Sequence, residues 1–122
     1  PETGEYVRWD KDAKGVDKTF SFKIRYSVSS SKFTVHSTKV SVKANAHVED
    51  LQGNPVSGYK GHKYTVSIVG VYSRNLQFAV QGKENGTISG LQKGGSYKVT
   101  ITNNDYLDAT RNLVGSGSIS TM

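Results

Sequence analysis

Two stretches of the sequence alternate strictly between apolar and polar residues, and this alternation limits the possible folds more than any other feature. In residues 20–28, and again in residues 40–48, every second residue is apolar. Successive side chains of a β-strand point to opposite faces, so a period of two predicts strands with one buried and one solvated face. Shorter runs of the same kind lie at 64–68, 76–80 and 97–101. The sequence therefore predicts an all-β protein.

Turn-forming residues separate these runs. The sequence Gly53-Asn54-Pro55 is typical of a turn, and Asn85-Gly86 is typical of a two-residue hairpin connection. About seven short antiparallel strands with regular turns are expected of an immunoglobulin-like sandwich. A chain of 122 residues has the size of one domain, so we expect a single domain over 1–122 with the sandwich in 18–121. The last apolar residues are Leu113, Val114 and Ile119 in a Gly/Ser-rich segment, and they predict a weak edge strand.

Residues 1–17 allow two interpretations. The residues Tyr6, Trp9, Ala13 and Val16 recur at helical offsets, which predicts one apolar face of a short N-terminal helix or arm. This face is then the candidate interface of a homodimer. A strand through residues 7–9 is the alternative.

The segment 88–101, Ile-Ser-Gly-Leu-Gln-Lys-Gly-Gly-Ser-Tyr-Lys-Val-Thr-Ile, resembles the tyrosine-corner region of fibronectin type III and other immunoglobulin-like domains. Leu91 and Tyr97 have the spacing of that region. In those domains the tyrosine hydroxyl forms a hydrogen bond back to the backbone. The resemblance implies a sandwich fold, and it implies no activity, because domains of unrelated function share it.

A second segment, 63–80, resembles the middle of the fungal immunomodulatory proteins. It contains Lys-Tyr-Thr-Val-Ser-Ile, then Arg-Asn-Leu, then Phe-Ala-Val. That family consists of small secreted proteins without cysteine, which have a fibronectin-III-like sandwich, dimerise through a short N-terminal helix, and are lectin-like and active on immune cells. The resemblance implies the same properties here.

The net charge is +6, which favours anionic partners. Residues 18–48 contain six Lys or Arg and no acidic residue. We expect Lys23, Arg25, Lys39 and Lys43 to form a basic strip on the solvent side of their strands. The strip is interpreted either as a site for an anionic polymer or as a solvated face that protects exposed strands from pairing. Nucleic acid is disfavoured as the polymer, because the sequence has no RNP-like aromatic pattern, helix-turn-helix spacing or zinc knuckle.

Several aromatic residues lie outside the alternating positions and form a candidate ligand-binding set with one arginine. The set is Trp9, Tyr59, Tyr72, Arg74 and Tyr106. Such side chains stack on sugar rings, or anchor a protein interface, while polar neighbours form hydrogen bonds.

Other kinds of site are disfavoured by composition. The sequence has no cysteine, which excludes disulfides, thiolate metal sites and cysteine nucleophiles. Its three histidines lack the spacing of a zinc site, so we expect no catalytic residues, no metal and no cofactor. No apolar run approaches the length that crosses a bilayer, so we expect no membrane insertion. Asn85-Gly86-Thr87 matches the N-glycosylation pattern, which makes Asn85 a candidate glycosylation site.

The sequence thus predicts a secreted, non-enzymatic binding protein, lectin-like or immunomodulatory, that engages a cell-surface glycan or protein receptor. A first residue other than Met fits removal of a signal peptide, which agrees with secretion, and it fits an artificial cloning boundary equally well. The alternative is a structural or adhesin-type immunoglobulin-like module of a bacterial surface protein.

Overall fold

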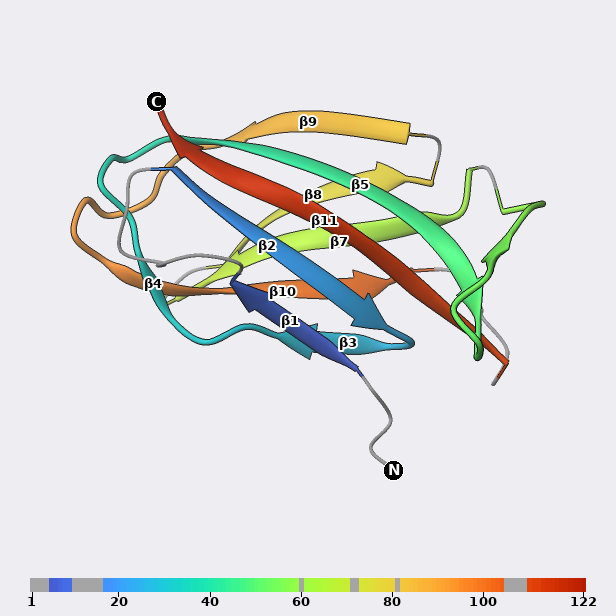
Figure 1. Cartoon of the computed structure of the whole chain (residues 1–122). Coiled ribbons are helices and arrows are strands. Elements are labelled where there is room, and N and C mark those ends of the chain that lie inside the picture. Colours follow the sequence, from blue (N-terminus) through green and yellow to red (C-terminus); the bar gives the residue numbers. More distant parts are fainter. Residues whose placement is uncertain (1–4, 10–16, 60, 71–72, 81, 105–109) are drawn as a thin grey trace.

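A computed structural model describes residues 5–9, 17–59, 61–70, 73–80, 82–104 and 110–122, and these ranges form two antiparallel β-sheets (Figure 1). The six-stranded sheet contains β1 (Tyr6–Trp9), β2 (Asp17–Ile24), β5 (Val40–Asp50), β6 (Pro55–Val56), β9 (Gly82–Ile88) and β11 (Arg111–Thr121). The five-stranded sheet contains β3 (Ser27–Ser29), β4 (Phe33–Thr34), β7 (Lys63–Val69), β8 (Ser73–Ala79) and β10 (Ser96–Asn103). The prediction of an all-β sandwich is confirmed.

Apart from β1 and β6, the strands pair as one long antiparallel hairpin that has been rolled up. The first of them, β2, pairs with the last, β11; β3 and β4 pair with β10; β5 pairs with β9; and β7 pairs with β8. The resulting orders are β2-β11-β5-β9 in one sheet and β3-β10-β7-β8 in the other. This pairing from the outside inward is a jelly roll. The immunoglobulin sandwich places its first and last strands in different sheets, so the connectivity expected from the sequence does not match this order.

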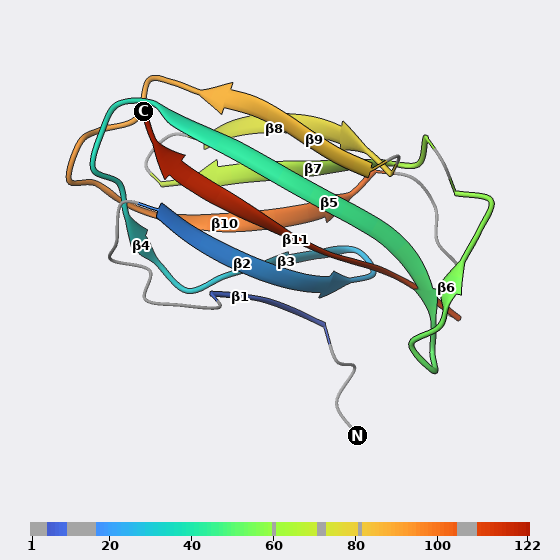
Figure 2. The same cartoon turned by 45° about the horizontal axis from the view of Figure 1, so that its top comes forward.

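The Gly/Ser-rich segment near the C-terminus forms β11, which lies in the middle of the six-stranded sheet between β2 and β5 (Figure 2). The prediction of a weak edge strand is therefore wrong. Two rows of side chains on the buried face explain this position: Phe20, Gly117 and Ala44 in one, and Phe22, Gly115 and Ala46 in the next. A Cβ at Gly117 would lie 2.6 Å from Phe20 Cζ and 2.4 Å from the Lys43 carbonyl oxygen. The phenylalanine rings occupy the space that the glycines leave.

The dipeptide Asn85-Gly86 lies inside β9 and is not a hairpin turn, so this prediction is also wrong. Gly86 pairs with Val42 of β5, and a Cβ at Gly86 would lie 2.9 Å from Leu76 Cδ1 of β8. The glycine therefore permits the close approach of β8 and β9, which belong to different sheets. A local turn propensity has been overridden by packing between the sheets.

The N-terminal helix is not formed by the residues that the structure describes, because Tyr6–Trp9 is strand β1, paired with β2. The alternative interpretation, a strand, is confirmed for this part. Ala13 and Val16 lie outside the described residues. Trp9 points toward the core, where its ring lies 5.0 Å from that of Phe33 and 5.9 Å from that of Phe20.

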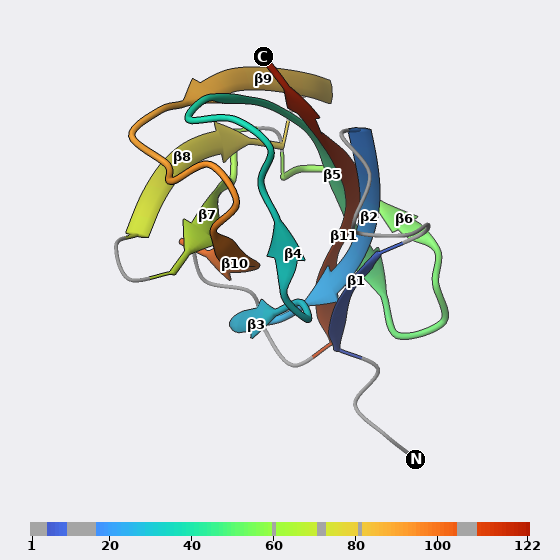
Figure 3. The same ribbon diagram turned by 90° about the vertical axis from the view of Figure 1, so that its left-hand side faces the viewer.

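Aromatic rings form a continuous path through the core. Phe22 and Tyr64 have ring centroids 6.1 Å apart, and Tyr64 and Phe78 are 5.9 Å apart. Tyr64 is fully buried, and this burial raises the pKa of its phenol. At one end of the sandwich, the segment with β4 passes from the five-stranded toward the six-stranded sheet (Figure 3). Phe33 of β4 is buried there beneath Lys18, whose ammonium lies 5.3 Å from the ring centroid.

The contact expected of a tyrosine corner is present. The Tyr97 hydroxyl accepts a hydrogen bond of 2.9 Å from the backbone N–H of Gln92, and Leu91 is buried beside it. The predicted run at 20–28 is interrupted, however. β2 ends at Ile24, and Tyr26 is 71% exposed in the bend before β3.

Replacing Gly117 with alanine tests the packing of β11. We expect Gly117→Ala to lower the free energy of unfolding by about 2–3 kcal/mol, because the new methyl group must displace both a ring and a backbone carbonyl. Urea unfolding measures the change. Ser118→Ala, on the solvent side of the same strand, is the control and should alter it by less than about 0.5 kcal/mol. Equal stabilities of the two variants would contradict this account of the core.

Candidate functional site

The structure does not bring the predicted aromatic set together. Trp9 packs against Phe33 of β4, whereas Tyr59 packs against His62 and lines a hollow with Val56 of β6. β4 and β6 lie at opposite ends of the sandwich (Figure 2). Tyr72 and Tyr106 lie outside the described residues.

Arg74 lies neither with Trp9 near β4 nor with Tyr59 near β6. It is the second residue of β8, and its Nε donates a hydrogen bond of 3.3 Å to the Ser89 carbonyl oxygen. Its guanidinium also covers Gly90. Arg74 therefore holds the loop after β9 and does not join an aromatic cluster in the described part of the chain.

Of the predicted basic strip, Lys23 and Lys43 share one surface and the other two residues lie apart from it. Lys23 alternates with buried Phe22 in β2, and Lys43 alternates with buried residues in β5, so both point outward from the six-stranded sheet. Arg25 lies past the end of β2, with Nη2 3.5 Å from Asn112 Oδ1. Lys39 is exposed just before β5.

Two further cations lie on that same surface. Arg8 of β1 is opposite Ser21 of β2, and Lys83 of β9 is opposite Asn45 of β5. Both side chains are exposed. These two cations were not recognised in the sequence, because residues 6–16 fit either a helix or a strand there and residues 85–86 were expected to form a turn. We call the outer surface of the six-stranded sheet, with Arg8, Lys23, Lys43 and Lys83, the cationic face.

Hydroxyl and amide groups fill the cationic face between these cations. One row across the strands is Arg8, Ser21, Ser116, Asn45 and Lys83, and the next is Thr19, Ser118, Lys43 and Asn85. Neighbouring strands are about 4.8 Å apart, so a row of five spans roughly 19 Å. Among the outward side chains that the structure describes on this sheet, the carboxylate is that of Glu49, at the end of β5.

A shallow hollow of about 370 Å³ lies near the centre of the cationic face. Its lining is Thr19, Lys43, Ala44, Asn45, Lys83, Ser116, Gly117 and Ser118. The floor is low because β11 carries only small residues there, whereas Lys43 and Lys83 are long. Both lysines therefore line the hollow beside small residues that carry hydroxyl groups.

The outer surface of the five-stranded sheet differs from the cationic face, because more of its side chains form hydrogen bonds with one another. Several of its hydroxyl groups form hydrogen bonds across strands, such as Ser29 with Thr100 at 2.7 Å and Ser67 with the Asn75 amide oxygen at 2.6 Å. On the cationic face, the side chains of Thr19, Ser116 and Ser118 form no hydrogen bond with any residue that the structure describes. Their donors and acceptors are available to a ligand.

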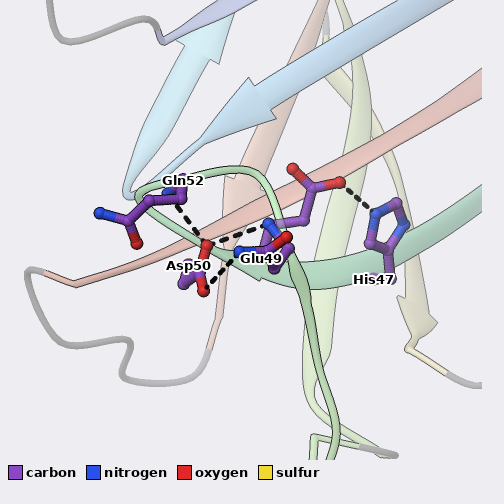
Figure 4. Close-up of polar contacts among 5 residues, drawn as sticks. His47, Glu49, Asp50 and Gln52 are labelled. Atoms are coloured by element: carbon purple, nitrogen blue, oxygen red, sulfur yellow. Dashed lines mark hydrogen bonds and ion pairs between the residues drawn. The ribbon is translucent and has the colours of Figure 1, made fainter.

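The end of the cationic face near β6 is closed by an acidic turn (Figure 4). His47 Nε2 lies 2.5 Å from Glu49 Oε2, which makes them an ion pair when the histidine is protonated. Asp50 Oδ1 accepts hydrogen bonds of 2.9 Å from the backbone N–H groups of Gln52 and Asn54. These bonds hold the β5–β6 turn.

The same bonds lower the pKa of Asp50. The N–H of Asn54 is the main cause, partial burial opposes it, and Gln52 and the Arg111 charge add to the lowering. Hydrogen bonds to a carboxylate favour its charged form. The turn is therefore held by an ionised carboxylate near neutral pH.

The histidines do not meet in the described structure. His62 is buried, and its Nε2 is hydrogen-bonded to Asn103 Oδ1; the Asn103 amide donates in turn to the Arg25 carbonyl oxygen at 3.0 Å. His47 pairs with Glu49 on the outer surface. No group of three or more His, Cys, Asp or Glu residues suited to a metal occurs in the described ranges. Nor do these ranges contain a helix long and apolar enough to cross a membrane.

Asn85 is exposed on β9, directly opposite Lys43. Its sequon therefore lies at the edge of the cationic face, and a glycan attached there would share that face with the hollow.

No protein-family model matches the chain, and no curated protein matches it. Neither of the two resemblances seen in the sequence is therefore supported by a family match. Among solved structures, the chain is similar to Aeromonas hydrophila PliG, a periplasmic lysozyme inhibitor of g-type lysozyme, at 9% identity over 95% of each chain and with a TM-score of 0.46. A likeness at this level transfers no partner and no residue role to this chain.

The Asp50 turn gives a pH-dependent prediction. A carboxylate whose folded pKa is lowered stabilises the fold above its ordinary pKa, near 3.8, and loses this effect as pH falls through the folded value. We expect Asp50→Asn to be less stable than the parent protein at pH 7, with the difference shrinking as the pH approaches 2. Urea unfolding at both pH values measures it. A difference that stays constant with pH would contradict a role for the charge.

Proposed function

We propose that this chain is a secreted, non-enzymatic binding domain that recognises acidic glycans at cell surfaces through its cationic face. The observation that carries the proposal is the contrast between the two outer surfaces. Arg8, Lys23, Lys43 and Lys83 lie among hydroxyl and amide groups on one sheet. On the other sheet, several hydroxyl groups already form hydrogen bonds across strands, with another hydroxyl group or with a side-chain amide.

Charge complementarity supports an anionic partner. Lysine and arginine attract anionic groups, and clustered cations raise the rate of encounter with a polyanion. A glycan also presents many hydroxyl groups, which pair with serine, threonine and asparagine side chains. A broad face spanning several strands suits an extended chain better than a small molecule. Jelly-roll folds include lectin domains, but the fold alone carries no function.

In this proposal the glycan is bound mainly through charge and hydroxyl contacts, and not through the aromatic stacking that the sequence suggested. Trp9 is engaged with the core through Phe20 and Phe33, and its Nε1 donates to the Ser31 carbonyl oxygen at 3.2 Å. Tyr59 is remote from it at the β6 end. These residues therefore do not form a joint platform for a sugar ring.

A binding experiment with paired charge reversals tests the proposal. Acidic glycans (chondroitin sulfate and hyaluronan) and a neutral glycan (dextran) are immobilised, and binding is measured at low and at physiological salt. We expect binding to an acidic glycan, weakened by salt. Lys23→Glu should weaken it roughly tenfold, which corresponds to one lost charge-assisted contact.

Lys98→Glu is the matched control, because Lys98 is exposed on the outer surface of the five-stranded sheet and its reversal changes the net charge equally. It should leave affinity within about twofold of the parent. Equal weakening by both variants would reduce the effect to overall charge and contradict a defined face. Absence of binding to every glycan would reject the proposal in favour of a protein receptor or the structural module.

A further inference from the structure

We propose that the hollow on the cationic face is a binding site for a sulfate ester, so that the acidic glycan recognised by this chain is a sulfated one. This inference rests on the proposed function and narrows its ligand class. It assigns the contacts to Lys43, Lys83, Ser116 and Ser118, with Thr19 at the edge of the hollow.

The two lysines are placed to hold one anion together. Lys43 is opposite Asn85 and Lys83 is opposite Asn45, so the lysines are diagonal neighbours on β5 and β9. Such neighbours have Cα atoms roughly 7–8 Å apart, which allows both ammonium groups to reach one anion between them. Both are exposed, and neither forms an ion pair with any residue that the structure describes. Two like charges at this separation repel one another, and an anion between them removes the repulsion.

Hydroxyl groups of β11 and β2 complete the binding site beside the two lysines. Ser118 is opposite Lys43, and Ser116 is opposite Asn45, both across β11 and β5. Thr19 is opposite Ser118. As described above, none of the three hydroxyl groups is used by a described neighbour. The floor between them is the β11 backbone at Gly117, whose own Cβ position faces the core, and the residues on either side of it are serines, which are small.

The arrangement of donors favours a tetrahedral group over a carboxylate. A sulfate ester has three terminal oxygens directed to different sides, whereas a carboxylate has two oxygens in one plane. Here the ammonium groups come from β5 and β9, and the hydroxyl groups come from β11 and β2, on the opposite side of the hollow. Three oxygens can meet donors on both sides at once.

A larger hollow of about 550 Å³ near the tyrosine corner is a weaker candidate. Its lining is Thr38, Gly90, Leu91, Gln92, Lys93, Gly95, Ser96 and Tyr97. It has one cation, Lys93, and the Tyr97 hydroxyl is already bonded to Gln92. It offers no second cation to share an anion with Lys93.

The test compares two glycans with the same backbone, chondroitin sulfate and unsulfated chondroitin, against the full chain. We expect the sulfated form to bind at least about tenfold more tightly at physiological salt. The variant Lys43→Gln/Lys83→Gln should remove most of this preference. Ser116→Val/Ser118→Val keeps the net charge and should still weaken binding of the sulfated form severalfold, because it removes hydroxyl donors. Circular dichroism and melting temperature establish that each variant is folded.

Lys93→Gln/Lys98→Gln is the matched control, since it removes the same charge from two exposed lysines elsewhere. It should leave the preference for sulfate unchanged. Equal affinity for both chondroitins, or an equal loss of the preference for sulfate in the two double-lysine variants, would contradict the sulfate-binding site and leave the proposed function standing. Binding to neither chondroitin would count against both. An oligothymidylate that binds as tightly and depends equally on Lys43 and Lys83 would overturn the commitment to a sulfated glycan.

Discussion

The close packing of Phe20 and Phe22 against two glycines of β11, Gly117 and Gly115, is the constraint on which the rest of the structure depends. Phe20 and Phe22 lie over Gly117 and Gly115, so β11 can lie beside β2 only with no side chain at these two inward positions. The period of two then places Ser116 and Ser118 outward, and a slip of one residue would bury them beneath the phenylalanine rings. One alternation of glycine and serine thus fits the strand to the core and forms the floor of the hollow on the other side.

Much of the fold could be predicted from local pattern, because which side of a strand is buried depends on the residues of that strand alone. The buried face of β5 is an example. Strand order could not be predicted in this way. The position of β11 depends on phenylalanines about a hundred residues earlier, and Asn85-Gly86 has a turn propensity that its contact with Leu76 overrides. Lys83 and Arg8 were missed as members of the candidate site for the same reason.

The outer surfaces of the two sheets differ in how many of their polar side chains already form hydrogen bonds within the protein. On the five-stranded sheet, hydroxyl and amide groups satisfy one another, as in the pairs Ser29–Thr100 and Ser67–Asn75. On the six-stranded sheet, Lys43 and Lys83 form no ion pair with any described residue. They lie beside the hydroxyl groups of Ser116 and Ser118, which form no hydrogen bond with any described residue. Lys83 lies on β9 at the edge of this sheet, where a charged side chain also discourages strand pairing between molecules. A sulfated glycan is the ligand proposed for the lysines and hydroxyl groups of the cationic face.

The most direct measurement is an amide NMR titration of the isotope-labelled chain with a short chondroitin sulfate oligosaccharide. The account predicts shift changes concentrated at Thr19, Lys43, Lys83 and residues 116–118, with Thr100 and Ser67 on the opposite sheet unmoved. Changes centred on the five-stranded sheet, or spread evenly over all exposed lysines, would contradict it.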